Sequence, residues 1–145
     1  AREVGVIPEV ISSMEEAGWE NGIEGFMATS DLQRVAEYID QYLPEIYYVN
    51  SEPGCVDIMA SGVSKWRGIK ILAESLNIAH EDILTVGNYY NDIDMLQHAG
   101  VGIAVANSLP EVKDVADFVT EYDNNHDAVA EIISKMLHHE YDMTK

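Results

Sequence analysis

Cysteine is almost absent from this 145-residue chain, and Cys55 is its only one. A disulfide within the chain is therefore excluded, and the apolar neighbours of Cys55 predict a buried thiol in a reducing compartment. Long hydrophobic runs are absent too, since no stretch approaches the ~18 apolar residues of a membrane-spanning helix. We expect a cytoplasmic protein with no membrane partner.

Basic residues are scarce: Lys and Arg number 8 against 26 Asp and Glu, which gives a formal charge of −18. A chain with this balance lacks the cations that displace counterions from a phosphate backbone, so we expect no nucleic-acid partner. The carboxylates serve either as solvated surface or, for a few of them, as ligands that converge on a divalent cation. Apolar residues make up 47% of the chain, which is ordinary for a globular protein.

The first 60 residues show an α+β pattern. Apolar residues at helical spacing predict a short helix over residues 9–17, and a strand is expected over residues 23–29. Asp31 is in place to cap a helix that ends before Pro44. Two further strands, over residues 46–50 and 55–60, are separated by a turn sequence and predict an antiparallel hairpin.

Strands and helices alternate from residue 62 onward. Ser64 is expected to cap the first helix, and short apolar strands then alternate with helical segments up to a final helix near the C-terminus; the expected strands cover residues 83–86, 101–105 and 117–120. This alternation predicts a small parallel sheet covered on both faces. The expected boundary lies at residues 61–64, which divides the chain into residues 1–61 and 62–145.

The segment Gly87 to Asp92, with the sequence GNYYND, carries the strongest chemical signal. It follows a strand, and ligands of open α/β sheets bind beyond the carboxyl ends of the strands. Asn88 and Asp92 offer oxygen ligands for a hard cation such as Mg²⁺, and Asn91 could steady a phosphate oxygen or a neighbouring carboxylate. Lys65 is placed to reach the same crevice and to neutralise charge on a transferred phosphoryl group.

Each of these residues also has an ordinary structural explanation. Asp92 suits the first turn of a helix, Asn88 is a common turn residue, and a lysine such as Lys65 is usually exposed to solvent. Tyr89 and Tyr90, inside the same segment, are candidates to line the crevice. The interpretation as a site therefore depends on the whole set and its order along the chain.

That order resembles a known family. The stretches GVSKWRGIKILAESLNI and ILTVGNYYNDIDMLQHAGVGIAVANSLPEVKDVADFVT, with the helix after Asp127, are similar to the C-terminal part of haloacid dehalogenase (HAD) superfamily phosphatases of the Cof type. In that branch a lysine opens a helix and a GDxxND motif follows one strand later. The similarity runs from about residue 62 to 137, and residues 1–60 resemble the trailing part of that branch's cap.

The resemblance implies an α/β fold: a partial Rossmann-like core with parallel strands, preceded by an α+β cap fragment. It also implies Mg²⁺-dependent hydrolysis of a small phosphorylated metabolite through an aspartyl phosphate. By position, Lys65 would stabilise charge, Asn88 and Asp92 would take the metal side, and Asn91 would order the loop around the phosphate. Asn107 matches a recurrent asparagine of the family without an assigned role.

The chain departs from the family pattern in two ways. The DxDGT motif that carries the nucleophile does not occur in it, and Asn88 stands where the family has a metal-binding Asp, which predicts weaker Mg²⁺ binding. We therefore hypothesise that residues 1–145 alone are inactive. The chain would be either the C-terminal piece of a longer enzyme, consistent with its start at Ala1, or a degenerate copy.

Two alternatives remain. A phosphorelay receiver is also acidic and contains lysine, but its lysine follows its acidic residues, whereas Lys65 precedes Asp92. The second alternative is a binding or regulatory module that keeps the crevice without the chemistry. Because a core without its first strand exposes a central strand edge, this alternative predicts self-association.

Overall fold

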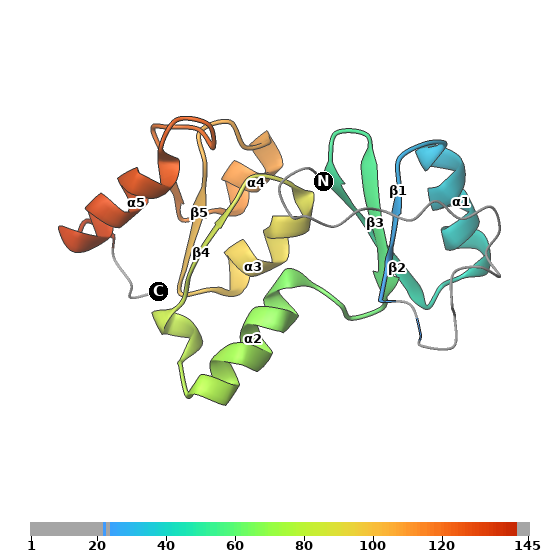
Figure 1. The fold of residues 1–145 in the computed structure, drawn as a ribbon, viewed down its shortest axis with the longest axis horizontal. Coiled ribbons are helices and arrows are strands. Elements are labelled where there is room, and N and C mark those ends of the chain that lie inside the picture. The colour runs from blue at the N-terminus through green and yellow to red at the C-terminus, as the bar shows by residue number, and fades with distance from the viewer. Residues whose placement is uncertain (1–21, 23, 142–145) are drawn as a thin grey trace.

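The computed structural model describes residue 22 and residues 24–141 of the chain. The helix expected over residues 9–17 lies outside these residues. The remaining secondary structure forms two lobes, which lie side by side in Figure 1 and are joined through the segment between β3 and α2.

The first lobe is a three-stranded antiparallel sheet with one helix. Its strand order is β1-β3-β2, and its elements are β1 (Phe26–Ala28), α1 (Leu32–Tyr42), β2 (Ile46–Glu52) and β3 (Cys55–Ala60). The expected hairpin is confirmed, with Glu52 opposite Cys55 at the turn. Asp31 precedes α1 as expected, but its backbone is left-handed (φ 50°) and its side chain makes no capping hydrogen bond, so the predicted cap is wrong.

The second lobe is a parallel α/β unit. Its sheet has the order β4-β5-β6, and its elements are α2 (Lys65–Leu76), η3 (His80–Asp82), β4 (Leu84–Gly87), η4 (Tyr90–Asp92), α3 (Ile93–His98), β5 (Val101–Ala104), α4 (Pro110–Val115), β6 (Phe118–Val119) and α5 (Ala128–Leu137), where η marks a 3₁₀ turn. The predicted parallel sheet is therefore confirmed.

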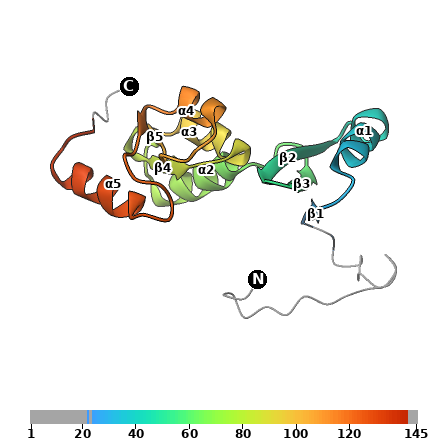
Figure 2. The ribbon, with the colours of Figure 1, turned by 90° about the horizontal axis from the view of Figure 1, so that it is seen from above.

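Helices cover both faces of this sheet, as expected (Figures 1 and 2). On one face, α3 and α4 bury an apolar cluster of Leu96, Ala104 and Val112. On the other face, α5 places Ile132 against Val101 and Ile103 of β5. These side chains are almost completely removed from water, which makes β5 the centre of the core.

One helix begins later than the sequence indicates. The sequence places Asp92 in the first turn of a helix, but Tyr90–Asp92 form a 3₁₀ turn, η4, and the α-helix begins at Ile93. The reason is local: the Asp92 carboxylate accepts hydrogen bonds from the backbone N–H groups of Asn88 and Tyr89, which draws the chain into a tighter turn.

The segment between the lobes is short and specifically held. Gly62 has φ 80°, a conformation that glycine adopts without strain, and its carbonyl oxygen accepts a hydrogen bond of 2.9 Å from Arg67 Nη1. The lobes also meet farther along the chain, since β2 lies against η4. The first lobe therefore lies next to the turn that carries Asp92.

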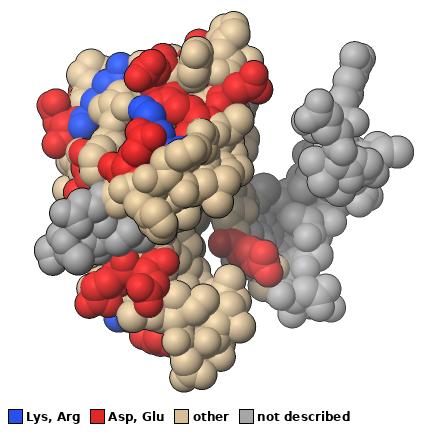
Figure 3. All heavy atoms as spheres, turned by 90° about the vertical axis from the view of Figure 1, so that its left-hand side faces the viewer, with Lys and Arg blue, Asp and Glu red and all other residues tan. Residues whose placement is uncertain are grey.

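The structure bears on the expectations about Cys55, about membrane spans and about the acidic surface. Cys55 is half-buried at the start of β3 rather than fully buried, and a hydrogen bond with Glu52 together with partial burial raises the pKa of its thiol. Among the described residues, no helix combines the length and apolar character that crossing a membrane requires. Figure 3 shows a face of the molecule on which acidic side chains outnumber basic ones.

Candidate active site

The candidate site lies at the carboxyl ends of β4 and β5. Gly87 and Ala104, the last residues of these strands, are direct partners in the parallel register, so the loops that follow them leave the sheet at one edge. A cavity of about 520 Å³ opens there, and its lining includes Lys65, Gly87, Asn88, Asp92, Met95, Val105, Asn124, Asn125 and Asp127. Open α/β sheets bind their ligands here, beyond the carboxyl ends of their strands.

Lys65 and Asp92 form the central pair. Lys65 Nζ lies 2.5 Å from Asp92 Oδ1, and the two side chains are 49% and 5% exposed. Asp92 Oδ2 accepts from the backbone N–H groups of Asn88 at 2.8 Å and Tyr89 at 3.2 Å. The buried carboxylate thus has a cation on one oxygen and two amide donors on the other, which compensates its loss of hydration.

A glycine makes this approach possible. A Cβ atom at Gly87 would lie 2.4 Å from Asp92 Cβ and 2.8 Å from Asp92 Cγ. Only the absence of a side chain lets the strand end pass so close to the carboxylate. The same glycine that ends β4 therefore fixes where Asp92 lies.

Lys65 is held at the start of its helix by a cap. Ser64 has extended backbone, and its Oγ accepts the backbone N–H of Arg67 at 3.1 Å, which confirms the predicted cap. Because Lys65 is the first residue of α2, its Cα position follows from where this helix begins. The Lys65 ammonium then reaches the crevice across the end of β4.

The two asparagines of the GNYYND segment lie differently. Asn88 lines the cavity and is exposed, while its backbone N–H anchors Asp92. The Asn91 side-chain oxygen is buried and has no hydrogen-bond partner among the described residues. The structure therefore places Asn88 at the crevice and leaves the Asn91 amide oxygen turned into the protein without a donor.

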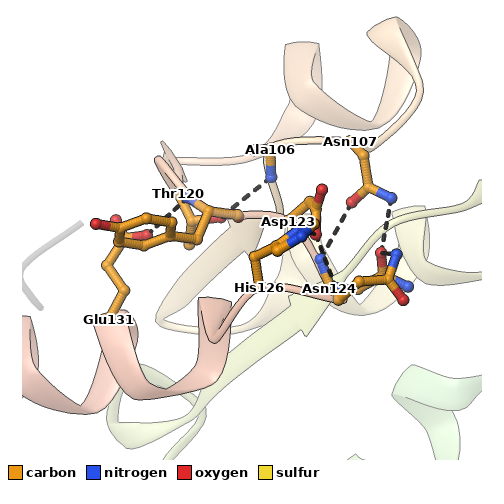
Figure 4. A network of polar contacts seen from close by, with 9 residues as sticks. Ala106, Asn107, Thr120, Asp123, Asn124, His126 and Glu131 are labelled. Carbon is orange, nitrogen blue, oxygen red and sulfur yellow. Dashed lines mark hydrogen bonds and ion pairs between the residues drawn. The ribbon is translucent and has the colours of Figure 1, made fainter.

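The sequence did not predict that the loop over residues 121–127 lines the cavity together with Lys65. The loop over residues 121–127 supplies Asn124, Asn125 and Asp127 to the cavity. Asn107 holds this loop, because its Nδ2 donates to Asn124 Oδ1 at 2.7 Å and its Oδ1 accepts from the Asn124 backbone N–H at 3.3 Å (Figure 4). The position of the loop in the chain could have indicated this role, because the loop follows β6, and the carboxyl end of β6 lies on the same side of the sheet as those of β4 and β5.

Side chains within the 121–127 loop and beside it complete the network in Figure 4. Asp123 Oδ1 lies 2.7 Å from His126 Nδ1 and accepts the Asn125 backbone N–H at 2.8 Å. These hydrogen bonds, led by the one from Asn125, hold the pKa of Asp123 below its ordinary value. Thr120 Oγ1 accepts from the Ala106 backbone N–H at 3.1 Å. Hydrogen bonds within the 121–127 loop and to the residues beside it therefore hold this side of the cavity.

The tyrosine pair does not line this cavity, contrary to the expectation from sequence. Tyr89 and Tyr90 pack edge to face with ring centres 5.3 Å apart, and Tyr90 Oη donates to Glu111 Oε1 of α4 at 3.2 Å. Burial and the Glu111 carboxylate raise the pKa of the Tyr90 phenol. The pair therefore connects η4 to α4.

The described residues do not by themselves form a magnesium site. They contain no cluster of three or more His, Cys, Asp or Glu side chains placed to hold a metal ion. Both oxygens of Asp92 already have donors, and Asn88 offers only a neutral amide oxygen. Mg²⁺ sites usually combine one or two carboxylates with phosphate oxygens and water, so further carboxylates would have to come from elsewhere.

Comparison with known proteins gives the family. The model of haloacid dehalogenase-like hydrolases matches residues 21–133, which is most of the chain and includes Lys65 and Asp92. The chain belongs to the haloacid dehalogenase-like hydrolases. A solved structure of a subclass IIB enzyme, described below, supports the Cof-type, subclass IIB branch.

Individual relatives agree with this assignment. The chain is 35% identical over 108 residues to the candidate phosphatase YxeH of Bacillus subtilis, a match that covers 74% of this chain and 40% of YxeH. It is 34% identical over 89 residues to the 5-amino-6-(5-phospho-D-ribitylamino)uracil phosphatase YcsE of the same organism, covering 61% of this chain and 35% of that protein. The solved structure of a subclass IIB sugar phosphatase superposes with a TM-score of 0.72 at 30% identity, covering 92% of this chain and 48% of that one. The chain therefore spans less than half the length of these relatives.

Proposed function

We propose that this chain supplies the lysine and metal-side half of a magnesium-dependent phosphate monoester phosphatase. Its substrate would be a small phosphorylated metabolite, and catalysis would proceed through a phospho-aspartate on a nucleophile that these 145 residues do not contain. In this role the Lys65 ammonium neutralises charge on the transferred phosphoryl group, and Asp92 holds that ammonium at the crevice. By itself the chain is expected to be inactive.

The observation that carries the proposal is the Lys65–Asp92 pair at the mouth of the cavity. The ammonium is half exposed and faces a space of about 520 Å³, so an anionic group has access to it. The carboxylate is buried and fixed by two backbone donors, so it stays in place as the charge in the crevice changes. A purely structural ion pair would not need an adjoining open cavity.

The free side of β4 is where the missing half would fit. Within the described residues, β4 pairs with β5 alone, and its other edge has no neighbouring strand. Lys65 of α2 and Val129 of α5 both line the cavity beside Val86, so the two helices flank this edge. A parallel strand added there would end beside Asp92 and would bring its carboxylates to the crevice.

Turnover of p-nitrophenyl phosphate tests the proposal. The chain alone is expected to show no Mg²⁺-dependent turnover, whereas a fragment carrying a DxDGT strand, fused ahead of residue 1 or added in trans, should produce it, and EDTA should abolish it. Lys65→Ala should then lower kcat by about 10²- to 10³-fold, the usual cost of removing one preorganised charge-stabilising group.

Lys70→Ala is the matched control. Lys70 lies five residues further along the same helix, is 61% exposed, and its Nζ is 3.9 Å from Glu74, so its loss should leave kcat unchanged. Mg²⁺-dependent turnover by residues 1–145 alone, sensitive to Lys65→Ala, would refute the half-site proposal.

A non-catalytic module that self-associates is the second candidate, and the exposed apolar side chains beside the open edge favour it. On α2 and α5 these are Ile71, Leu72, Leu76, Val129, Ile133, Met136 and Leu137. Where exposed apolar side chains form one continuous surface, that surface is typical of an interface. If complementation fails while the chain forms a defined dimer, this candidate replaces the first.

A further inference from the structure

Three consecutive residues at the start of α2 are each attached to the segment that follows β4. Lys65 pairs with Asp92. Before it, Ser64 Oγ donates to Asp94 Oδ2 at 2.5 Å. After it, the Trp66 ring stacks on His98 with centroids 5.7 Å apart and planes 20° from parallel.

We infer that Ser64 and Asp94, supported by the Trp66–His98 stack, form a clamp that positions Lys65 against Asp92. Ser64 and Asp94 are positioning residues in this scheme, since neither lines the cavity. The inference rests on the proposed role of Lys65 in the crevice. It adds a reason why a half-exposed lysine keeps one orientation.

The clamp adds to the ion pair in keeping the Lys65 side chain in one orientation. A long lysine side chain loses much rotamer freedom when it is fixed, and this entropy cost offsets part of what the half-exposed ion pair gains. The hydrogen bond from Ser64 to a carboxylate belongs to the stronger, charge-assisted kind. Fixing the backbone on both sides of Lys65 restricts where its ammonium can reach.

Asp94 is itself anchored from two sides. Its Oδ2 accepts from Ser64, while its Oδ1 lies 3.1 Å from His98 Nδ1. The same His98 nitrogen lies 2.8 Å from the Asp94 backbone oxygen, one turn earlier in α3. The carboxylate therefore links the first turn of α2 to the body of α3.

The clamp lies where the chain passes from the first lobe into α2. The chain enters α2 from the first lobe through residues 61–63, where Gly62 has a left-handed backbone. The clamp begins at the next residue, Ser64. The clamp therefore holds the backbone at the point where the chain from the first lobe enters α2, directly before Lys65.

Competitive acetylation of the purified chain, followed by mass spectrometry, tests the clamp without phosphate, metal or a nucleophile half. The ratio of Lys65 to Lys70 modification reports how freely the Lys65 ammonium leaves Asp92. Ser64→Ala and Asp94→Ala should each raise this ratio about threefold, and Asp92→Asn should raise it at least as much. Ser64→Thr, which restores the hydroxyl, should return the ratio to that of the unmodified chain.

Two comparisons separate the clamp from simpler effects. Asp94→Asn removes the charge but keeps an acceptor for Ser64, so it should raise the ratio less than Asp94→Ala does. Asp94→Ala leaves the bond from Arg67 N–H to Ser64 in place, so it tests the clamp with the helix cap intact, and circular dichroism verifies that the helices remain.

Equal ratios for Asp94→Asn and Asp94→Ala would overturn the clamp, as would an unchanged ratio in Ser64→Ala and Asp94→Ala while Asp92→Asn raises it. An unchanged ratio in Asp92→Asn would overturn the Lys65–Asp92 pair and the clamp with it. Failure of the clamp alone leaves the complementation experiment on the proposed phosphatase untouched, so the two can fail separately.

Discussion

Gly87 shows how one missing side chain sets the geometry of the candidate site. Its position leaves no room for a Cβ atom, because Asp92 Cβ, Cγ and Oδ2 would all lie within 3 Å of it. Asp92 in turn carries the contacts that hold Lys65 and the η4 turn. A change at Gly87 is therefore expected to act on the site through Asp92.

Gly87→Ala should destabilise the chain by about 1–3 kcal/mol, because the added methyl group forces Asp92 out of its place. Urea unfolding followed by circular dichroism measures this. Gly68→Ala is the control: Gly68 lies inside α2, a Cβ there meets nothing within 4 Å, and the change should be neutral or stabilising. Equal stability of the two variants would contradict the crowding at Gly87.

Glu131 is a second residue whose environment makes a sharp prediction. Burial acts to raise the pKa of this carboxyl, but hydrogen bonds from Lys135 and from the backbone N–H groups of Glu121 and Tyr122 outweigh it, so the pKa lies below its ordinary 4.5. A carboxyl with a lowered folded-state pKa stabilises the fold fully above its unfolded pKa and less as the pH falls through the folded value.

Glu131→Gln should therefore cost about 1–3 kcal/mol at neutral pH, and the difference from the unmodified chain should shrink as the pH is lowered below about 4.5. Urea unfolding over a pH series measures the difference. Glu74→Gln, in an exposed pair with Lys70, should show little difference at any pH. A gap between Glu131→Gln and the unmodified chain that stays constant with pH would contradict the role given to Glu131.

The residues that sequence predicted well are those whose chemistry depends on local order. Ser64 as a cap, and Lys65 and Asp92 as neighbours in space, follow from helix starts and strand ends. The Ser64–Asp94 bond and the burial of the Asn91 oxygen were not predictable, because they depend on how α2 packs on α3 and β2 on η4. Such packing has no signature within a short window of sequence.

At the scale of elements, the periodic segments were predictable and the irregular ones were not. The strands and helices from β1 to α5 lie where the apolar pattern places them. The exceptions are the 3₁₀ turns η3 and η4 and the capping at Asp31, since side-chain hydrogen bonds rather than periodicity decide them. The loop over residues 121–127 escaped notice because it has no periodicity at all.

That loop depends on Asn107, and its dependence can be measured. Asn107→Ala removes both side-chain hydrogen bonds to Asn124, so amide hydrogen exchange over residues 121–127 should accelerate about tenfold, while exchange in β5 stays unchanged. Asn125→Ala removes one long side-chain bond, of 3.3 Å, and serves as the control with a smaller effect. Faster exchange throughout the lobe would instead indicate a general loss of stability.

At the scale of the whole molecule, two features oppose each other. The open edge of β4 and the apolar side chains on α2 and α5 favour association. A formal charge of −18 on each chain opposes it. Salt decides the balance, because the Debye length falls from about 30 Å at 0.01 M to about 8 Å at 0.15 M.

Self-association should therefore increase with salt. Size-exclusion chromatography with light scattering is expected to show more dimer as sodium chloride is raised. Ile133→Glu, which replaces an exposed apolar side chain of α5 with a further negative charge, should reduce the dimer fraction. A fragment that pairs with the β4 edge should also reduce the dimer fraction, because the fragment and a second copy of the chain would compete for the same surface. A clean monomer at every salt concentration would contradict this expectation.

The stack of Trp66 on His98 gives the molecule an optical property. The chain has two tryptophans, so Trp19→Phe leaves Trp66 as the sole indole emitter. Its fluorescence then reports contact between α2 and α3, because the imidazole ring lies against the indole only while these helices stay together. Time-resolved emission could thus follow the start of α2 during complementation, in real time and without an added label.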